Sequence, residues 1–242
     1  MRLALEEADA TYVDVARSRK DGGVTAMTRL MEGDAVKTPS FAPPFLKAGK
    51  LIVGQIANIL LYLGGRHGLA PASEAGRLWT HQLQLTLADF VVEAHDVHHP
   101  LGANFYYEDQ KKESKRRAAD FIEQRIPKFL RYFERVQERN RSKEHLVGRS
   151  LTYADLSLFQ VVAGLNYAFP RAMLRLKDKY PRVSALHAAA ARRPRIAAYL
   201  ASDRRIPFSE EGIFRHYGDS TPRIRPAARA DDPRDATGPV GG

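Results

Sequence analysis

The sequence predicts a mostly α protein in which a small α+β N-terminal domain precedes an all-α helical-bundle domain. Two short apolar runs flank a turn in residues 45–53, and an apolar helix with Gln55 at its start follows them, which is typical of a hairpin packed on a helix. From residue 73 onward, capped segments with helical apolar spacing follow one another, which predicts the helical domain.

The first 65 residues are predicted to run helix, strand, helix, hairpin, helix. Leu3, Leu5 and Ala8 share one face of an opening helix. The β-branched and aromatic segment 11–15 predicts a short strand, and a second helix is expected over 24–31, ended by Gly33. The hairpin of residues 45–53 and a helix over 56–63 complete the domain, which we bound at 1–65.

A polar linker at 66–72 leads into the helical domain, which we bound at 73–218. Ser73 can cap a helix that carries Glu74 in its first turn and ends near His99. A long helix is expected over about 110–140, with a kink at Pro127 because proline lacks a backbone donor and clashes with the preceding turn.

Thr152 and Asp155 form the acidic version of a capping box, with Leu151 and Leu156 placed as its hydrophobic staple. The helix that follows, 153–169, is apolar nearly all round and is expected to be buried. Further helices are expected over 171–179, 182–192 and 195–202. The segment 219–242 is rich in Pro, Gly, Arg and Asp and predicts a disordered tail.

Composition limits the classes of function. The chain has no cysteine, which excludes disulfides, thiolate metal sites and cysteine nucleophiles within its 242 residues. No apolar run is long enough to cross a bilayer, and the acidic residues in the first ten positions are unlike a signal peptide, so we expect a cytoplasmic protein without membrane association.

The net charge of +10 admits an anionic substrate or nucleic acid as partner. Thirteen Lys or Arg against six Asp or Glu lie in residues 111–149, but the aromatic residues there follow helical spacing, as core residues do. Nucleic-acid binding is therefore the lowest of the alternatives kept open.

Several motifs, in this order and spacing, resemble the glutathione S-transferase family. Pro44, Leu46, Gly49, Gln55 and Ile59 match the hairpin and helix of its N-terminal domain. The Thr-x-x-Asp cap at 152–155 resembles the cap of the family's buried core helix, and Tyr180-Pro181 with the segment 191–200 is similar to its closing helices. The resemblance covers about residues 1–205. It implies a thioredoxin-like N-terminal domain that here lacks the first strand and the catalytic loop.

The same resemblance implies a glutathione site at Pro43, Pro44, Gln55 and Ile56. In the family a cis-proline opens the hairpin, and the residue before it presents its backbone N–H and C=O to the cysteinyl part of glutathione. Here that residue is Pro43, which has no N–H. Gln55 matches the Glu or Gln that binds the γ-glutamyl end, but Ile56 stands where the family has a hydroxyl. The site is expected to be modified or weakened.

The resemblance assigns no catalytic residue within this chain. The family places a Tyr, Ser or Cys near the first strand to stabilise the glutathione thiolate, and the match begins only in the middle of the first helix. We expect that group before Met1, in a chain whose start is internal or truncated.

Other candidate residues follow from the resemblance and from spacing. Glu93 could reach across a dimer interface, and Tyr106 and Tyr107 could border the pocket for an apolar electrophile. His95, His98 and His99 lie on one helix face, but no further ligand set is evident, so no metal is expected.

If residues before Met1 supply the catalytic hydroxyl or thiol, the sequence thus predicts a homodimeric glutathione S-transferase-like enzyme. With glutathione as co-substrate, this enzyme conjugates it to a small apolar electrophile or uses it for reduction. A non-catalytic binding or assembly module of the same fold is the second hypothesis. A basic nucleic-acid-associated protein is the third.

Overall fold

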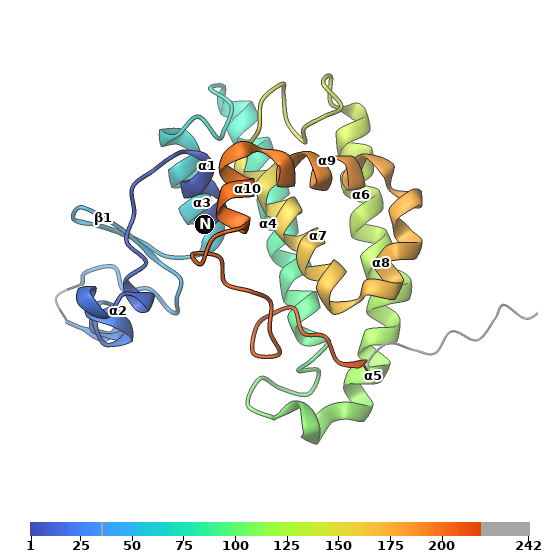
Figure 1. The fold of residues 1–242 in the computed structure, drawn as a ribbon, viewed down its shortest axis with the longest axis horizontal. Coiled ribbons are helices and arrows are strands. Elements are labelled where there is room, and N and C mark those ends of the chain that lie inside the picture. Colours follow the sequence, from blue (N-terminus) through green and yellow to red (C-terminus); the bar gives the residue numbers. More distant parts are fainter. Residues whose placement is uncertain (35, 219–242) are drawn as a thin grey trace, which may run out of the picture.

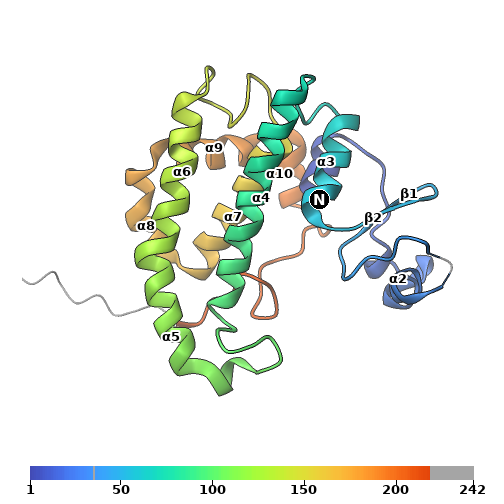
Figure 2. The same cartoon turned by 180° about the vertical axis from the view of Figure 1, so that it is seen from behind.

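The computed structural model describes residues 1–34 and 36–218. A bundle of helices forms the body of the molecule, and the hairpin with α2 projects from one side of it (Figure 1), as the view from behind also shows (Figure 2). The segment 219–242, for which the sequence predicts disorder, lies outside the described residues.

The N-terminal region follows the predicted order with one exception. Its elements are α1 (Arg2–Glu7), α2 (Gly23–Glu32), β1 (Leu46–Ala48), β2 (Leu51–Val53) and α3 (Ile56–Arg66). Gly33 ends α2, as predicted, and α3 extends three residues further than the apolar run indicated.

The prediction of a strand over 11–15 is wrong. Residues 11–14 carry no regular structure, and a 3₁₀ turn, Val15–Arg17, follows them. A strand needs a neighbour to pair with, and the sheet of the described residues contains only β1 and β2. Side chains hold the segment instead: Tyr12 Oη donates to Glu6 Oε1 at 2.7 Å, and Arg2 Nε donates to Asp14 Oδ2 at 2.7 Å.

The hairpin is antiparallel and pairs Leu46 with Val53, Lys47 with Ile52, and Ala48 with Leu51. Gly49 has φ of 61° at the turn, a conformation that costs glycine little because it has no Cβ. Val53 is 6% exposed, so the end of β2 is fixed in the core just before α3 begins.

The helical domain agrees closely with the sequence. Its helices are α4 (Glu74–Asp96), α5 (Lys111–Asp120), α6 (Ile126–Arg139), α7 (Tyr153–Ala168), α8 (Pro170–Leu176), α9 (Pro181–Arg192) and α10 (Pro194–Leu200). Ser73 caps α4 by accepting from the Gly76 amide at 3.2 Å. A π-helical turn, Phe121–Arg125, separates α5 from α6 just before Pro127, where the sequence predicts a kink.

Helix α7 is the centre of the bundle, as its all-round apolar sequence predicts. Tyr153, Leu158 and Leu165 are fully buried. Asp155 accepts from the Thr152 amide at 2.7 Å, the Thr152 hydroxyl at 2.8 Å and the Leu146 amide at 2.8 Å. This carboxylate therefore fixes both the start of α7 and the loop before it.

The N-terminal region is attached to the bundle through α1 and α3. Arg193, at the start of α10, forms an ion pair with Glu7, and Arg204 pairs with Glu6 at 3.0 Å. Gly64 of α3 lies so close to the Tyr153 ring that a Cβ there would be 2.5 Å from it. Helices α1 and α10 thus lie side by side, as Figure 1 shows.

Candidate functional site

The loop before β1 and the start of α3 lie beside each other at the end of the hairpin. The Pro43–Pro44 peptide bond is cis. The pairing of β1 with β2 ends at Leu46 and Val53. The loop that carries Pro44 and the segment that leads to Gln55 therefore leave the hairpin at the same end.

A close contact behind the hairpin supports this juxtaposition. A Cβ on Gly54 would lie 2.9 Å from Ser40 Oγ, so only glycine fits there without a shift. Ser40 is 8% exposed, and its hydroxyl has no partner within the described residues. The segment leading to Pro43 therefore packs directly against the residue that precedes Gln55.

Gln55 has an unusual backbone conformation, with φ of 64° and ψ of 123° at the N-cap of α3. A non-glycine residue in this region costs of order 1–3 kcal/mol and persists only where the surrounding structure holds it, which makes such residues candidates for a functional site. Gln55 is exposed, and its carbonyl accepts from the Ile59 amide at 2.8 Å. Its side chain is therefore presented at the helix start.

The groups available at this end of the hairpin are a carbonyl, an amide side chain and the first N–H groups of α3. The N–H groups of the first helical turn have no partner inside the helix and favour an anion such as a carboxylate. Pro43 contributes a carbonyl but no N–H. Ile56 is 36% exposed at the first helical position and offers no hydroxyl. The geometry suits a peptide-like anion held mainly by the backbone.

Glu93 is bound within its own chain. Arg125 donates to both of its carboxylate oxygens, at 2.7 Å and 2.6 Å, in a bidentate pair between α4 and the turn before α6. The pair is partly exposed. A contact from Glu93 to another subunit would have to share this carboxylate with Arg125.

The two tyrosines predicted to border an acceptor pocket are placed differently. Tyr106 is 79% exposed, whereas Tyr107 is 6% exposed. The Tyr107 ring stacks on that of Tyr217, with ring centroids 3.7 Å apart. Only Tyr106 is directly accessible to a substrate.

The histidine cluster is part of the packing at the end of α4. His98 is 1% exposed, lies edge-on to Tyr217, and neither of its ring nitrogens has a partner within the described residues. Burial lowers its pKa to about 3. The rings of His95 and His99 stack at 5.0 Å. In the part of the chain that the structure describes, no three His, Cys, Asp or Glu are grouped to hold a metal ion.

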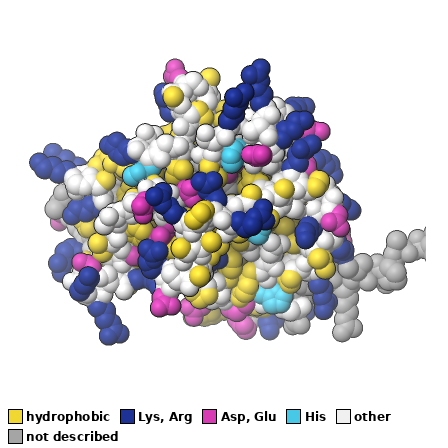
Figure 3. Space-filling model, turned by 45° about the horizontal axis from the view of Figure 1, so that its top comes forward, with side chains coloured by type: hydrophobic (Ala, Val, Ile, Leu, Met, Phe, Trp, Pro, Cys, Tyr) yellow, Lys and Arg dark blue, Asp and Glu magenta, His cyan; other side chains and the backbone are white. Residues whose placement is uncertain are grey.

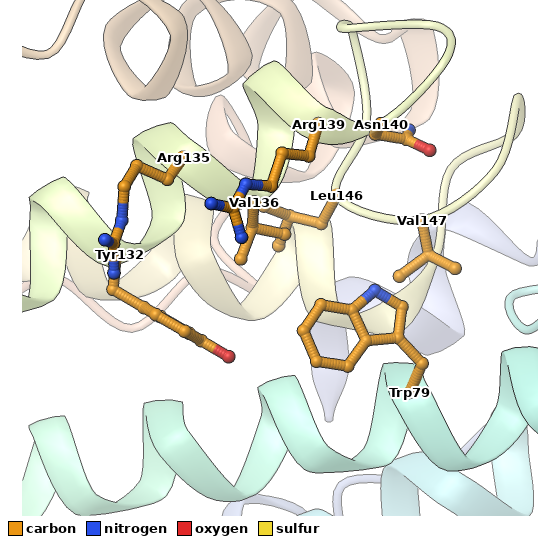
Figure 4. Close-up of a pocket in the computed structure, with 8 residues that line it drawn as sticks. All are labelled: Trp79, Tyr132, Arg135, Val136, Arg139, Asn140, Leu146 and Val147. Carbon is orange, nitrogen blue, oxygen red and sulfur yellow. The ribbon is translucent and has the colours of Figure 1, made fainter.

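Sequence reasoning missed a cavity of about 220 Å³ between α4 and α6. Trp79 points into it from α4, and Tyr132, Arg135 and Arg139 come from α6 (Figure 4). The i, i+4 spacing of the two arginines was visible, but the loop residues Leu146 and Val147 that close the cavity come from beyond the helix.

The segment after α10 was also missed as a structural element. It runs back along the bundle toward α5 (Figure 1). Phe208 stacks on Tyr167 at 5.3 Å, and Phe214 is 7% exposed against Gly164, where a Cβ would meet its ring at 2.3 Å. The aromatic residues of this helix-free segment were the available signal, because such residues seldom lie unpacked in a loop.

Comparisons with known proteins agree with the fold. The family model "Glutathione S-transferase, C-terminal domain" matches residues 95–203. A glutathione S-transferase of Plasmodium falciparum is 24% identical over 171 residues, which cover 68% of this chain and 72% of that protein. Glutathione S-transferase P 1 of Xenopus laevis is 26% identical over 67% of this chain and 69% of its own length.

Solved structures show the same architecture. A Pi-class glutathione S-transferase of Onchocerca volvulus superposes with a TM-score of 0.62 at 19% identity, covering 82% of this chain and 84% of that one. Prostaglandin synthase D of Nilaparvata lugens has a TM-score of 0.63 at 18% identity and covers 85% and 92%. With the family model and the curated relatives, these likenesses confirm the resemblance to the glutathione S-transferase family that the sequence suggested.

Proposed function

We propose that the protein is a glutathione-dependent transferase that joins the glutathione sulfur to a small apolar electrophile. The observation that supports this is the cis Pro43–Pro44 bond just before β1, together with the unusual backbone of Gln55, which follows the paired strand β2 at the start of α3. The N-terminal region is, in this proposal, a thioredoxin-like glutathione domain over 1–65, joined by the linker 66–72 to the helical domain 73–218.

Each group at this end of the hairpin has one role in binding. The Pro43 carbonyl accepts the cysteinyl N–H of glutathione. The Gln55 side chain and the first N–H groups of α3 bind the γ-glutamyl carboxylate, which the positive end of the helix dipole favours. Ile56 contributes only its backbone N–H. The basic net charge of +10 favours an anionic tripeptide as ligand.

In the conjugation step, the glutathione thiolate attacks the electrophilic carbon, a C–S bond forms and the leaving group departs with its electron pair. Tyr106 borders the acceptor side, with Tyr107 behind it. A glutathione-dependent reduction at the same thiolate is the other reaction that this site would support. No described residue is assigned the role of stabilising the thiolate.

A homodimer is part of the proposal. Leu78, Leu85 and Val92 are 65%, 49% and 58% exposed and follow one another at seven-residue spacing along α4. Phe41, in the loop before the proline pair, is 95% exposed. Apolar side chains exposed in a line are better buried against a second copy than left in water. Glu93 lies on the same helix and would approach this interface together with Arg125.

A cytoplasmic location is proposed from the composition. Within residues 1–34 and 36–218, no helix combines the length and the apolar character needed to cross a bilayer.

Titration of glutathione by calorimetry tests the binding step, and spectrophotometry with a chlorodinitrobenzene tests the transfer. Gln55→Ala should weaken glutathione binding about tenfold, as expected when a hydrogen bond to a charged group is lost. Gln124→Ala, an exposed glutamine in the turn before α6, is the matched control and should change nothing. If the protein does not bind glutathione at millimolar concentration, the proposal that it is a glutathione-dependent transferase is wrong.

A non-catalytic binding module is the second candidate, and two observations favour it. Pro43 and Ile56 each lack a donor that a glutathione site uses, and Tyr107 is covered by Tyr217. Binding of glutathione without any transfer would support this candidate. Nucleic-acid association ranks below both, because the Lys and Arg side chains on the face drawn in Figure 3 are scattered among acidic and apolar ones.

A further inference from the structure

The loop between α4 and α5 is closed by one buried side chain. Gln110 ends the 3₁₀ turn Tyr107–Gln110 and is fully buried, although residues 103–106 of the loop before it are exposed. Glutamine is seldom buried unless its amide is hydrogen-bonded. The partners of Gln110 therefore show what holds this loop, which carries Tyr106.

The Gln110 amide binds the backbone of the loop near both of its ends. Its Oε1 accepts from the Leu101 amide at 2.9 Å, and its Nε2 donates to the Phe105 carbonyl at 3.1 Å and to the Gly102 carbonyl at 3.3 Å. These partners also fix the orientation of the amide, because a flipped amide would set its oxygen against two carbonyl oxygens. One side chain thus ties the loop to the start of α5.

The base of the loop is fixed by the bundle. Ser114 is fully buried in α5, and its hydroxyl donates to the Val97 carbonyl, just after α4, at 2.7 Å. The Tyr106 amide donates to Asp109 Oδ2 at 3.2 Å, which fixes the end of the loop to the 3₁₀ turn. Gln110 therefore lies between a fixed base and an exposed loop, and the conformation of the loop depends on it.

The loop that Gln110 holds exposes apolar side chains. Leu101, Phe105 and Tyr106 are 60%, 52% and 79% exposed. Apolar side chains gathered on one loop are better placed against an apolar ligand than in water. A loop whose conformation is fixed in advance binds such a ligand more tightly, because no ordering of the loop is needed on binding.

We propose that Gln110 is a positioning residue for the electrophile. Through its hydrogen bonds to Leu101, Gly102 and Phe105, it holds the loop 101–106 in the conformation that receives the acceptor substrate. This role rests on the transferase function proposed above and identifies a residue that sets acceptor affinity. Gln110 itself touches neither substrate, because its side chain is buried and bonded to the loop backbone.

A comparison of two buried glutamines in the full chain tests the role. Gln110→Met keeps the length of the side chain and removes its amide. Gln137→Met is the matched control, because Gln137 is 1% exposed and its Nε2 donates to the Lys143 carbonyl at 3.0 Å, which ties a different loop to α6. Both variants should keep the helical circular dichroism of the native chain. Gln110→Asn, whose amide is one methylene too short, replaces Gln110→Met if that variant fails to fold.

Proteolysis measures the loop without any transfer reaction. Chymotrypsin cleaves after aromatic residues, and the exposed Phe105 and Tyr106 are its sites in this loop. Cleavage there, identified by mass spectrometry, should be about tenfold faster in Gln110→Met than in the native chain, because the open loop is populated more. Gln137→Met should be cleaved in this loop at the native rate.

Kinetics with chlorodinitrobenzene measure the effect on the acceptor. At saturating glutathione, the KM for the electrophile should rise about fivefold to tenfold in Gln110→Met, because the loop no longer presents one fixed apolar surface. The KM for glutathione should stay at its native value, since the loop lies outside the glutathione site. Gln137→Met should leave both KM values unchanged.

Two results would overturn the proposal. One is cleavage of the loop 101–106 at the same rate in Gln110→Met and Gln137→Met. The other is faster cleavage with an unchanged KM for the electrophile, which would make Gln110 a purely structural residue. If the native chain transfers nothing although Gln110→Met opens the loop, the transferase proposal fails and the closure of the loop by Gln110 stands, so the two failures are distinguishable.

Discussion

The N-terminal region and the helical bundle become ordered in different ways. Helix α2 has no buried residue, and neither has β1. Helix α7, in contrast, buries apolar residues on every side, from Tyr153 to Ala168. The bundle therefore forms a hydrophobic core of its own. The N-terminal region is held in place by α1 and α3, which pack against that core. The candidate glutathione site therefore lies in the N-terminal region, which is less able to fold independently of the rest of the chain.

A pair of leucine substitutions tests this difference most directly. Leu87 of α4 is 1% exposed, and Leu87→Ala should lower the free energy of unfolding by about 2–5 kcal/mol, because it removes buried surface and leaves a cavity. Leu30 of α2 is only half-buried, and Leu30→Ala should cost less than about 1 kcal/mol. Urea unfolding followed by circular dichroism measures both. Equal losses would show that α2 contributes a core of its own.

The capping carboxylate of α7 should be nearly as costly to remove. Asp155→Ala leaves the Leu146 and Thr152 amides and the Thr152 hydroxyl buried without their acceptor, which should cost about 3 kcal/mol. Asp178→Ala, an exposed acid beside α8, serves as control and should stay within about 0.5 kcal/mol. Thermal unfolding compares the two. If Asp155→Ala lowers the stability no more than Asp178→Ala does, the Asp155 carboxylate does not stabilise the bundle.

The stability of the bundle should also fall in acid, because His98 is buried in its neutral form. Its pKa is lowered from 6.5 to about 3 in the folded protein, so below pH 6.5 the unfolded chain binds a proton that the folded chain does not. Stability from this residue is complete above pH 6.5 and is lost at up to about 1.4 kcal/mol per pH unit as the pH falls toward 3. The slope of unfolding free energy against pH, measured for the native chain and His98→Phe, should differ by this amount. Parallel slopes would contradict it.

The smallest expected effect is an increase in glutathione affinity from a substitution in the N-terminal region. Ile56→Ser places a hydroxyl at the start of α3, where it can donate to a ligand carboxylate, and should tighten glutathione binding by about 1.5 kcal/mol, roughly tenfold. Ile56→Ala removes the same apolar group without adding a donor and should leave affinity nearly unchanged. Calorimetric titration of both variants distinguishes the hydroxyl from the loss of bulk. Equal affinities would mean that the ligand does not reach this position.

Features set by neighbouring residues could be predicted from the sequence. The hairpin around Gly49, the Ser73 cap and the capping box of Thr152 and Asp155 each depend on a few adjacent positions. The segment 11–15 has strand-like residues, yet it is not a strand, because pairing needs a neighbour that the segment cannot itself specify.

The parts of the site that could not be predicted depend on distant contacts. Tyr217 covers Tyr107 from a separation of more than a hundred residues, and no local pattern in either segment signals that contact. The cavity beside Trp79 likewise forms where two helices and a loop from beyond them meet. The cis bond before Pro44 could be expected from the sequence only through resemblance, and the strained backbone of Gln55 could not be expected at all.

The position of Trp79 has an optical consequence. It is the single tryptophan of the chain, and it is half-buried in the cavity between α4 and α6, on the helix that carries the exposed Leu78 and Leu85. Indole emission moves to shorter wavelength when water leaves its surroundings. Fluorescence of the unlabelled protein is thus a built-in gauge of how much water fills the cavity between α4 and α6.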